Sequence, residues 1–152
     1  MVFIILFGAS AFTGIFMSLD GDQLIATWIS SVGIGKWGAF AIMMAIVFVM
    51  GMFLDWLGIV MIVFPIFLPI MDMFGFDRLW IVAVTAVMLQ TCFMTPPFGF
   101  ALFYIKGIVP PEVKIQEIYR GVIPFILIII AVVVLVTIFP QVVYFLPNLV
   151  AS

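Results

Sequence analysis

The chain has 152 residues, of which 68% are hydrophobic and 8% are charged, and its formal net charge is −2. Five basic and seven acidic side chains cannot cover a soluble protein of this size, so the composition indicates an integral membrane protein embedded in a lipid bilayer. Histidine is absent and Cys92 is the single cysteine, which excludes an intrachain disulfide and histidine-based metal or acid–base chemistry. We therefore expect no enzyme, no cofactor, no transition-metal site and no nucleic-acid partner.

Two apolar segments open the chain. Residues 2–19 form a run of about 18 mostly apolar residues, which is long enough for one transmembrane helix. We expect this helix to be retained, because no signal-peptide cleavage pattern follows it. Residues 23–35 mix apolar side chains with serines, glycines and Trp28. This mixture predicts a segment lying in the membrane interface, with a simple loop as the alternative.

Residues 36–71 are too long for one span and too short for two. One straight helix of about 36 residues would extend about 54 Å, well beyond a bilayer core of about 30 Å. Two spans and a turn would need more than about 40 residues. We therefore predict a re-entrant helical hairpin with its tip between Gly51 and Gly58. The alternative is one full span over residues 37–57 followed by a broken interfacial segment.

Asp55 is the only acidic residue in the predicted hairpin before its last turn. An ionised carboxylate at membrane depth needs a cation, a partner or a water-filled cavity. One interpretation is that Asp55 holds or attracts a coupling cation. The other is that it caps the second hairpin helix through backbone N–H groups, and the two roles are compatible.

Residues 79–105 form the next predicted span, which the sequence Thr95-Pro96-Pro97-Phe98-Gly99 interrupts. The two prolines remove two backbone donors and free carbonyl groups, so this is a broken transmembrane helix and a candidate binding site. The polar side chains of Gln90, Thr91 and Thr95 suit alkali-ion coordination. The alternative is that the threonine hydroxyls bond back to their own helix.

The last third of the chain contains a polar connector at residues 106–118, a final transmembrane helix at residues 119–139 and a tail at residues 140–152. Three of the five basic residues, Lys106, Lys114 and Arg120, lie in or beside the connector. By the positive-inside rule the connector is cytoplasmic. Counting spans then places the C-terminus on the outer side.

Five short motifs bear a family resemblance: residues 51–55, 65–69, 75–77, 95–99 and 120–124. In their order and spacing they resemble the C-terminal part of the large permease (M) subunit of tripartite ATP-independent periplasmic (TRAP) transporters. The resemblance implies the second half of an inverted-repeat, elevator-type transporter in the bacterial inner membrane. It also implies sodium-driven import of organic acids, together with a small membrane subunit and a soluble periplasmic substrate-binding protein.

The resemblance further implies a sodium site made of backbone oxygens near Gly51, Cys92, Thr95 and Phe98. Pro96, Pro97 and Gly99 would shape the helix break around it. The family often has glycine where this chain has Cys92, and a carbonyl ligand would survive that change. The N-terminal half of the permease would be missing from this chain, so we expect no sodium-dependent uptake by the chain alone.

Two alternatives to this function stay open. One is a structural or regulatory membrane subunit that packs against a partner permease without transporting, and such a subunit should not respond to sodium. The other is a transporter of a different ion-coupled family with a similar hairpin and broken span, which would need no soluble binding protein.

Overall fold

The computed structural model describes residues 2–31, 33–97 and 99–151, and its elements there are eight α-helices and one short 3-10 helix. The predicted all-α membrane protein is thereby confirmed. By length and composition, two of the described helices, α4 (Trp56–Met73) and α7 (Ile115–Ile138), could cross a membrane. A bent pair near the N-terminus would make a third crossing if the pair counts as one span.

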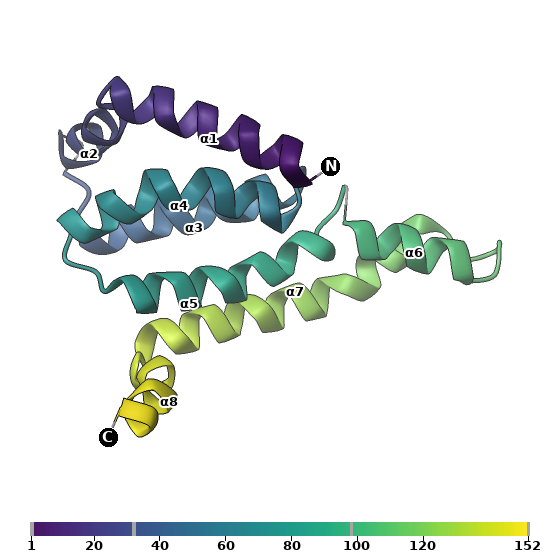
Figure 1. Cartoon of the computed structure of the whole chain (residues 1–152). Helices are drawn as coiled ribbons and strands as arrows, with labels where there is room; N and C mark the ends of the chain where they lie inside the picture. The colour runs from purple at the N-terminus through teal and green to yellow at the C-terminus, as the bar shows by residue number, and fades with distance from the viewer. Residues whose placement is uncertain (1, 32, 98, 152) are drawn as a thin grey trace.

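That bent pair is α1 (Val2–Ser18) and α2 (Gly21–Ser31). The two axes meet at 68°, and Asp20 adopts a positive φ of 52° at the bend. Both helices pack against α4, so the pair folds over one side of the bundle (Figure 1). The segment expected at residues 23–35 is thus a helix that begins two residues earlier and ends at Ser31.

Helices α3 (Lys36–Gly51) and α4 (Trp56–Met73) form an antiparallel hairpin whose tip is residues 52–55 (Figure 1). At 1.5 Å per residue they extend about 24 Å and about 27 Å. The second arm ends at Met73, two residues beyond the predicted boundary, and Gly75 lies in the turn that follows. Gly75 has φ +72°, and the N–H groups of Gly75 and Phe76 donate to the carbonyls of Asp72 and Met71. This pattern closes the helix and favours glycine.

The predicted broken helix consists of α5 (Arg78–Leu89), the 3-10 turn η1 (Gln90–Phe93) and α6 (Phe100–Ile108). The bond between Pro96 and Pro97 is cis. Asp77 begins α5 by accepting a hydrogen bond from the backbone N–H of Trp80 at 3.0 Å. Helix α6 includes Lys106, which we had expected in the connector, and Pro110 and Pro111 follow its end.

Helix α7 (Ile115–Ile138) begins four residues before the predicted span. The reason is a cap: the backbone N–H of Lys114 donates to the carboxylate of Glu117 at 3.0 Å, which satisfies a donor at the helix start. The expected tail is also corrected, because residues Gln141–Ala151 form helix α8. Pro140 ends α7, and its fixed φ suits the start of a new helix.

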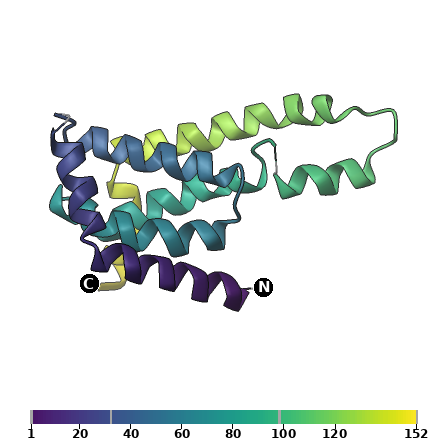
Figure 2. The same ribbon diagram turned by 90° about the horizontal axis from the view of Figure 1, so that it is seen from above.

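The described helices share one long axis, with α2 and α8 gathered at one end and the α6–α7 connector at the other (Figures 1 and 2). We name these the hairpin-base end and the connector end. Every charged residue of the chain except Asp55 lies in segments at or near one of these ends. The hairpin-base end carries Asp20, Asp22, Lys36, Asp72, Asp77 and Arg78, and the connector end carries Lys106, Glu112, Lys114, Glu117 and Arg120.

Two hydrophobic clusters follow the same division. The larger one joins α2, α3, α4, α5 and the C-terminal half of α7. The smaller one joins α6 to the N-terminal half of α7 through Leu102, Ile118 and Val122. The broken helix passes from the first cluster to the second, while α7 runs through both.

Candidate functional site

The tip of the hairpin lies directly against the break in the neighbouring helix. Gly51 is the last residue of α3, and a Cβ atom built on it would lie 2.6 Å from Sγ of Cys92 and 3.4 Å from its Cα. Both residues are buried. The structure therefore brings together two residues predicted for the sodium site, 41 positions apart in the chain. We call residues 51–55 together with residues 90–97 and 99 the tip–break junction.

The proline pair leaves two carbonyls of the junction short of helical partners. A helical carbonyl accepts from the N–H three or four residues later. For Phe93 these positions are Pro96 and Pro97, which have no N–H, and for Cys92 the fourth position is Pro96. The N–H of Thr95, the other donor in reach of Cys92, binds Thr91 at 2.9 Å instead. The carbonyl oxygens of Cys92 and Phe93 therefore lack the N–H partners that a continuous helix would give them.

Gly99 closes the other side of the break. A Cβ atom on Gly99 would lie 2.9 Å from the carbonyl oxygen of Phe93 and 3.0 Å from the carbonyl carbon of Met94. Backbone atoms cannot move aside as a flexible side chain can, so this position excludes larger residues. Phe98, also predicted for the sodium site, lies outside the described residues.

The threonine hydroxyls at the junction bond locally. The Oγ1 of Thr91 donates to the carbonyl of Met88, and that of Thr95 donates to the carbonyl of Thr91, each at 2.7 Å. Both side chains are buried. Each hydroxyl uses its one hydrogen in this way and keeps its oxygen lone pairs, so the local bond and a role as oxygen ligand are compatible.

Gln90 does not join this buried set. Its side chain is exposed and lines a groove of about 420 Å³ between α4 and α5, with mostly apolar neighbours such as Trp56 and Phe64. The prediction that Gln90 acts together with Thr91 and Thr95 depends on their being near neighbours in the chain. On a helical turn, however, adjacent residues face different directions.

Asp55 caps the second hairpin helix, as one of its two predicted roles requires. Its Oδ1 accepts a hydrogen bond from the backbone N–H of Gly58 at 3.1 Å, and its own carbonyl accepts from Ile59 at 3.2 Å. The side chain is half-buried. A carboxylate has about four acceptor positions, so this cap leaves acceptor capacity at the hairpin tip.

Four helix ends meet at the junction. Helix α3 and the α5–η1 segment end there, and α4 and α6 begin there. Helix C-termini carry partial negative charge and attract cations, whereas N-termini carry partial positive charge and attract anions. The junction therefore offers carbonyl oxygens for a cation beside N–H groups suited to an anion.

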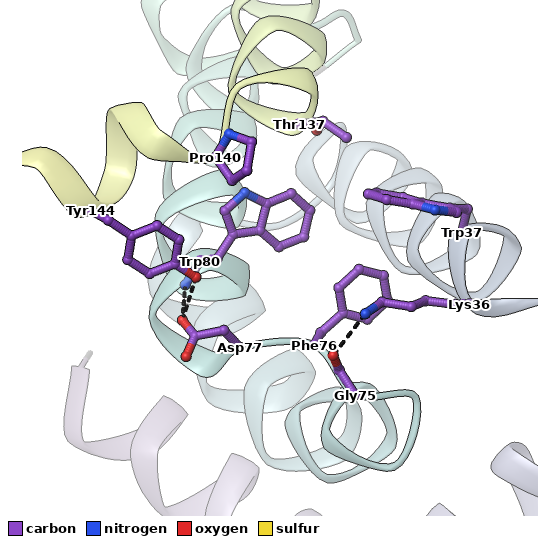
Figure 3. Close-up of a pocket in the computed structure, with 9 residues that line it drawn as sticks. All are labelled: Lys36, Trp37, Gly75, Phe76, Asp77, Trp80, Thr137, Pro140 and Tyr144. Carbon is purple, nitrogen blue, oxygen red and sulfur yellow. Dashed lines mark hydrogen bonds between the residues drawn. The ribbon is translucent and has the colours of Figure 1, made fainter.

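A second cluster of polar and aromatic residues, at the hairpin-base end, was not predicted from the sequence. A pocket of about 230 Å³ there is lined by Lys36, Trp37, Gly75, Phe76, Asp77, Trp80, Thr137, Pro140 and Tyr144 (Figure 3). The sequence indicated interfacial tryptophans but gave no sign that Trp37 and Trp80 meet. The backbone N–H of Trp80, followed by the hydroxyl of Tyr144, lowers the pKa of Asp77 below its ordinary value.

Comparison with known proteins identifies the family. The family model of the DctM component of tripartite ATP-independent periplasmic transporters matches residues 1–142. The chain belongs to this family. Among TRAP relatives, it is 33% identical to the sialic acid TRAP transporter permease of Haemophilus influenzae, over 69% of the chain and 17% of that protein.

Two further TRAP large permeases match nearly the whole chain. The C4-dicarboxylate permease of Pseudomonas aeruginosa is 26% identical over 97% of the chain and 34% of its own length. The ectoine/5-hydroxyectoine permease of Ruegeria pomeroyi is 28% identical over 100% of the chain and 35% of its own length. The chain thus spans about a third or less of the TRAP permeases it matches. The predicted resemblance to the TRAP large permease subunit is confirmed.

Proposed function

We propose that this chain is the cation-binding half of a sodium-coupled secondary transporter that imports organic acids. The convergence of four helix ends at the tip–break junction is the observation that carries the proposal. Broken helices of this kind bind coupling ions at their C-terminal ends and anionic substrate groups at their N-terminal ends in transporters built from repeats. The names of the TRAP relatives, which include sialic acid and C4-dicarboxylates, support an organic acid as substrate.

The proposed membrane placement follows from helix lengths and charges. Helix α7 extends about 36 Å, enough to cross the bilayer, whereas the hairpin reaches only the level of the break and so enters and leaves from one face. The connector end carries three basic and two acidic residues, which favours the cytoplasm. The hairpin base and the C-terminus then face the periplasm across the inner membrane, with α2 and α8 in the interface.

In this proposal sodium is held by oxygen atoms of both sides of the junction. The carbonyls of Gly51 and Cys92, the carbonyl or hydroxyl of Thr95 and the carbonyl of Phe98 supply ligands, and Asp55 adds negative charge at the hairpin tip. Hard cations prefer such oxygen ligands. Sodium binding would tie the tip to the broken helix, so that the loaded unit moves as one body in an elevator-type step.

The rest of the machinery lies outside this chain. The relatives are about three times as long, and the substrate site of an inverted-repeat transporter lies between its two repeats. We therefore propose an N-terminal permease half, a small membrane subunit and a periplasmic substrate-binding protein as partners, and no enzymatic activity.

Thermal unfolding of the permease that contains this chain, in sodium against potassium at equal ionic strength, tests the proposal. Sodium should raise the midpoint, and Thr95→Val should reduce that rise. The matched control is Thr85→Val, because Thr85 is equally buried and its hydroxyl makes the same 2.7 Å local bond, to Ile81, away from the junction. Asp55→Asn should also weaken the sodium effect while its side-chain oxygen retains the helix cap.

Equal midpoints in the two salts would refute the sodium site and favour a structural or regulatory subunit. If the sodium effect were present but equally reduced by Thr85→Val and Thr95→Val, the junction would not be the place where the ion binds. Transport in the absence of any soluble binding protein would leave the sodium site standing and refute the proposed partner.

A further inference from the structure

We propose that the pocket at the hairpin-base end binds the headgroup of a zwitterionic phospholipid, phosphatidylethanolamine. The pocket is at the end of the hairpin arms opposite the tip, since Lys36 begins α3 and Gly75 follows the end of α4. Its depth matters for this assignment, since it lies at the level of α2 and α8. The proposal relies on the membrane placement proposed above, which puts this level among the lipid headgroups.

The walls of the pocket are aromatic. The ring of Phe76 stacks on Trp80 with centroids 5.5 Å apart, and Trp37 meets both rings edge-on, at 5.6 Å and 6.3 Å. Trp80 and Phe76 are buried, whereas Trp37 is 57% exposed. Aromatic faces attract an ammonium group, and a tryptophan with one exposed side is typical of the membrane interface. The Nζ of Lys36 already lies over the Phe76 ring, 4.3 Å from its centroid, so Trp37 supplies the exposed part of this aromatic wall.

Opposite charges stand on opposite sides of this wall. Asp77 lies with Tyr144 on one side of the pocket, and Lys36 lies on the other, with Phe76 between them (Figure 3). Phosphoethanolamine has the same arrangement, with an ammonium at one end and a phosphate at the other. The pocket has room for about eight water molecules at about 30 Å³ each.

Lys36 and Asp77 both retain hydrogen-bonding capacity for a ligand. The Nζ of Lys36 donates one hydrogen bond, to the carbonyl of Gly75 at 2.7 Å, and an ammonium has three donors. The Oδ1 of Asp77 accepts from the N–H of Trp80 at 3.0 Å and from the hydroxyl of Tyr144 at 2.9 Å. These bonds fix the carboxylate at the pocket rim, and a carboxylate has about four acceptor positions, which gives it capacity for an ammonium.

The test measures which lipid the full chain retains. The chain is reconstituted in vesicles of equal parts phosphatidylethanolamine and phosphatidylglycerol, extracted in mild detergent, and its bound lipids are counted by native mass spectrometry. We expect enrichment of phosphatidylethanolamine. Asp77→Asn keeps an oxygen for the cap but removes the charge, and should lower the ratio of retained phosphatidylethanolamine to phosphatidylglycerol by about tenfold, the worth of a charge-assisted hydrogen bond.

A second variant and a control make the result independent of folding. Lys36→Gln retains a donor for Gly75 and should reduce the retention of both phospholipids, because each carries a phosphate. Asp72→Asn changes a carboxylate at the same end that lies outside the pocket and pairs with Arg78, so it should leave the ratio unchanged.

Three outcomes would overturn the proposal. The first is equal retention of the two lipids, and the second is an unchanged ratio in Asp77→Asn. The third is stabilisation of the detergent-solubilised chain by free phosphoethanolamine as strongly as by the intact lipid, which would assign the pocket to a soluble zwitterion. A negative result in this lipid test does not affect the sodium test, because none of these variants lies in the tip–break junction.

Discussion

The contact between Gly51 and Cys92 makes a quantitative prediction. Alanine at position 51 would place its Cβ 2.6 Å from Sγ of Cys92, well inside ordinary van der Waals separation. Overpacking of a buried contact costs about 1–3 kcal/mol, and replacing glycine in a helix regains about 0.5–1 kcal/mol. We therefore expect Gly51→Ala to lower the free energy of unfolding by a net of about 0–2.5 kcal/mol.

Removing the sulfur should remove the penalty. In a Cys92→Ala background the nearest side-chain atom is Cβ at 3.4 Å, an ordinary contact, so Gly51→Ala should cost nothing or stabilise slightly. Cys92→Ser keeps an atom near the sulfur position and should retain most of the penalty. Gly107→Ala, in α6, is the control for helix propensity, because nothing lies within 4 Å of a Cβ built there.

The measurement is a double-mutant cycle on free energies of unfolding, obtained by reversible denaturation in detergent. A coupling of about 1 kcal/mol or more between positions 51 and 92 is expected. Costs that add to within about 0.3–0.5 kcal/mol would mean that the hairpin tip does not touch the broken helix as described. The tip–break junction would then lose its geometric basis.

Two other predictions concern the break and the hairpin base. Gly99→Ala should destabilise the chain by about 1–3 kcal/mol in the same unfolding assay, since its Cβ would meet the backbone of Phe93 and Met94, and no single side-chain truncation should rescue it. A neutral Gly99→Ala would contradict the described break. The lowered pKa of Asp77 means that its contribution to stability is present above its ordinary pKa of 3.8 and is lost as the pH falls through the lower folded value. The unfolding midpoint should therefore drop less on acidification in Asp77→Asn than in the original chain, and identical pH profiles would contradict the bonds from Trp80 and Tyr144.

Local chemistry made much of this fold predictable. The prolines at 96 and 97 mark the break because they lack N–H groups, wherever the chain places them. Asp55 marks a helix start by the same local logic, although a functional role had equal standing in the sequence, whereas the cap formed by Asp77 was not predicted. The start of α7 was missed because Glu117 acts through a backbone bond to Lys114 that a hydrophobicity pattern does not register.

Long-range packing set the limit of prediction. Nothing in the residues around Gly51 indicates that Cys92 packs against it. The sequence predicts that residues of the tip–break junction lie together only through the family resemblance. The aromatic wall of Trp37, Phe76 and Trp80 joins three chain segments, so the sequence likewise does not indicate that these side chains meet. The prolines at 140 and 147 predict a tail, yet Pro140 precedes helix α8 and Pro147 is accommodated within it.

The continuity of α7 through both hydrophobic clusters bears on the order in which the protein is made. Helix α6 has nine residues, about 14 Å, and cannot cross a bilayer by itself. Its buried partners, Ile118 and Val122, lie on α7 and leave the ribosome later. Helix α6, the distal part of the broken helix, therefore stays at the translocon, or at the membrane surface, until α7 is inserted. A premature stop before Ile115 should therefore leave α6 without its buried partners, even though every residue predicted for the tip–break junction has already been synthesised.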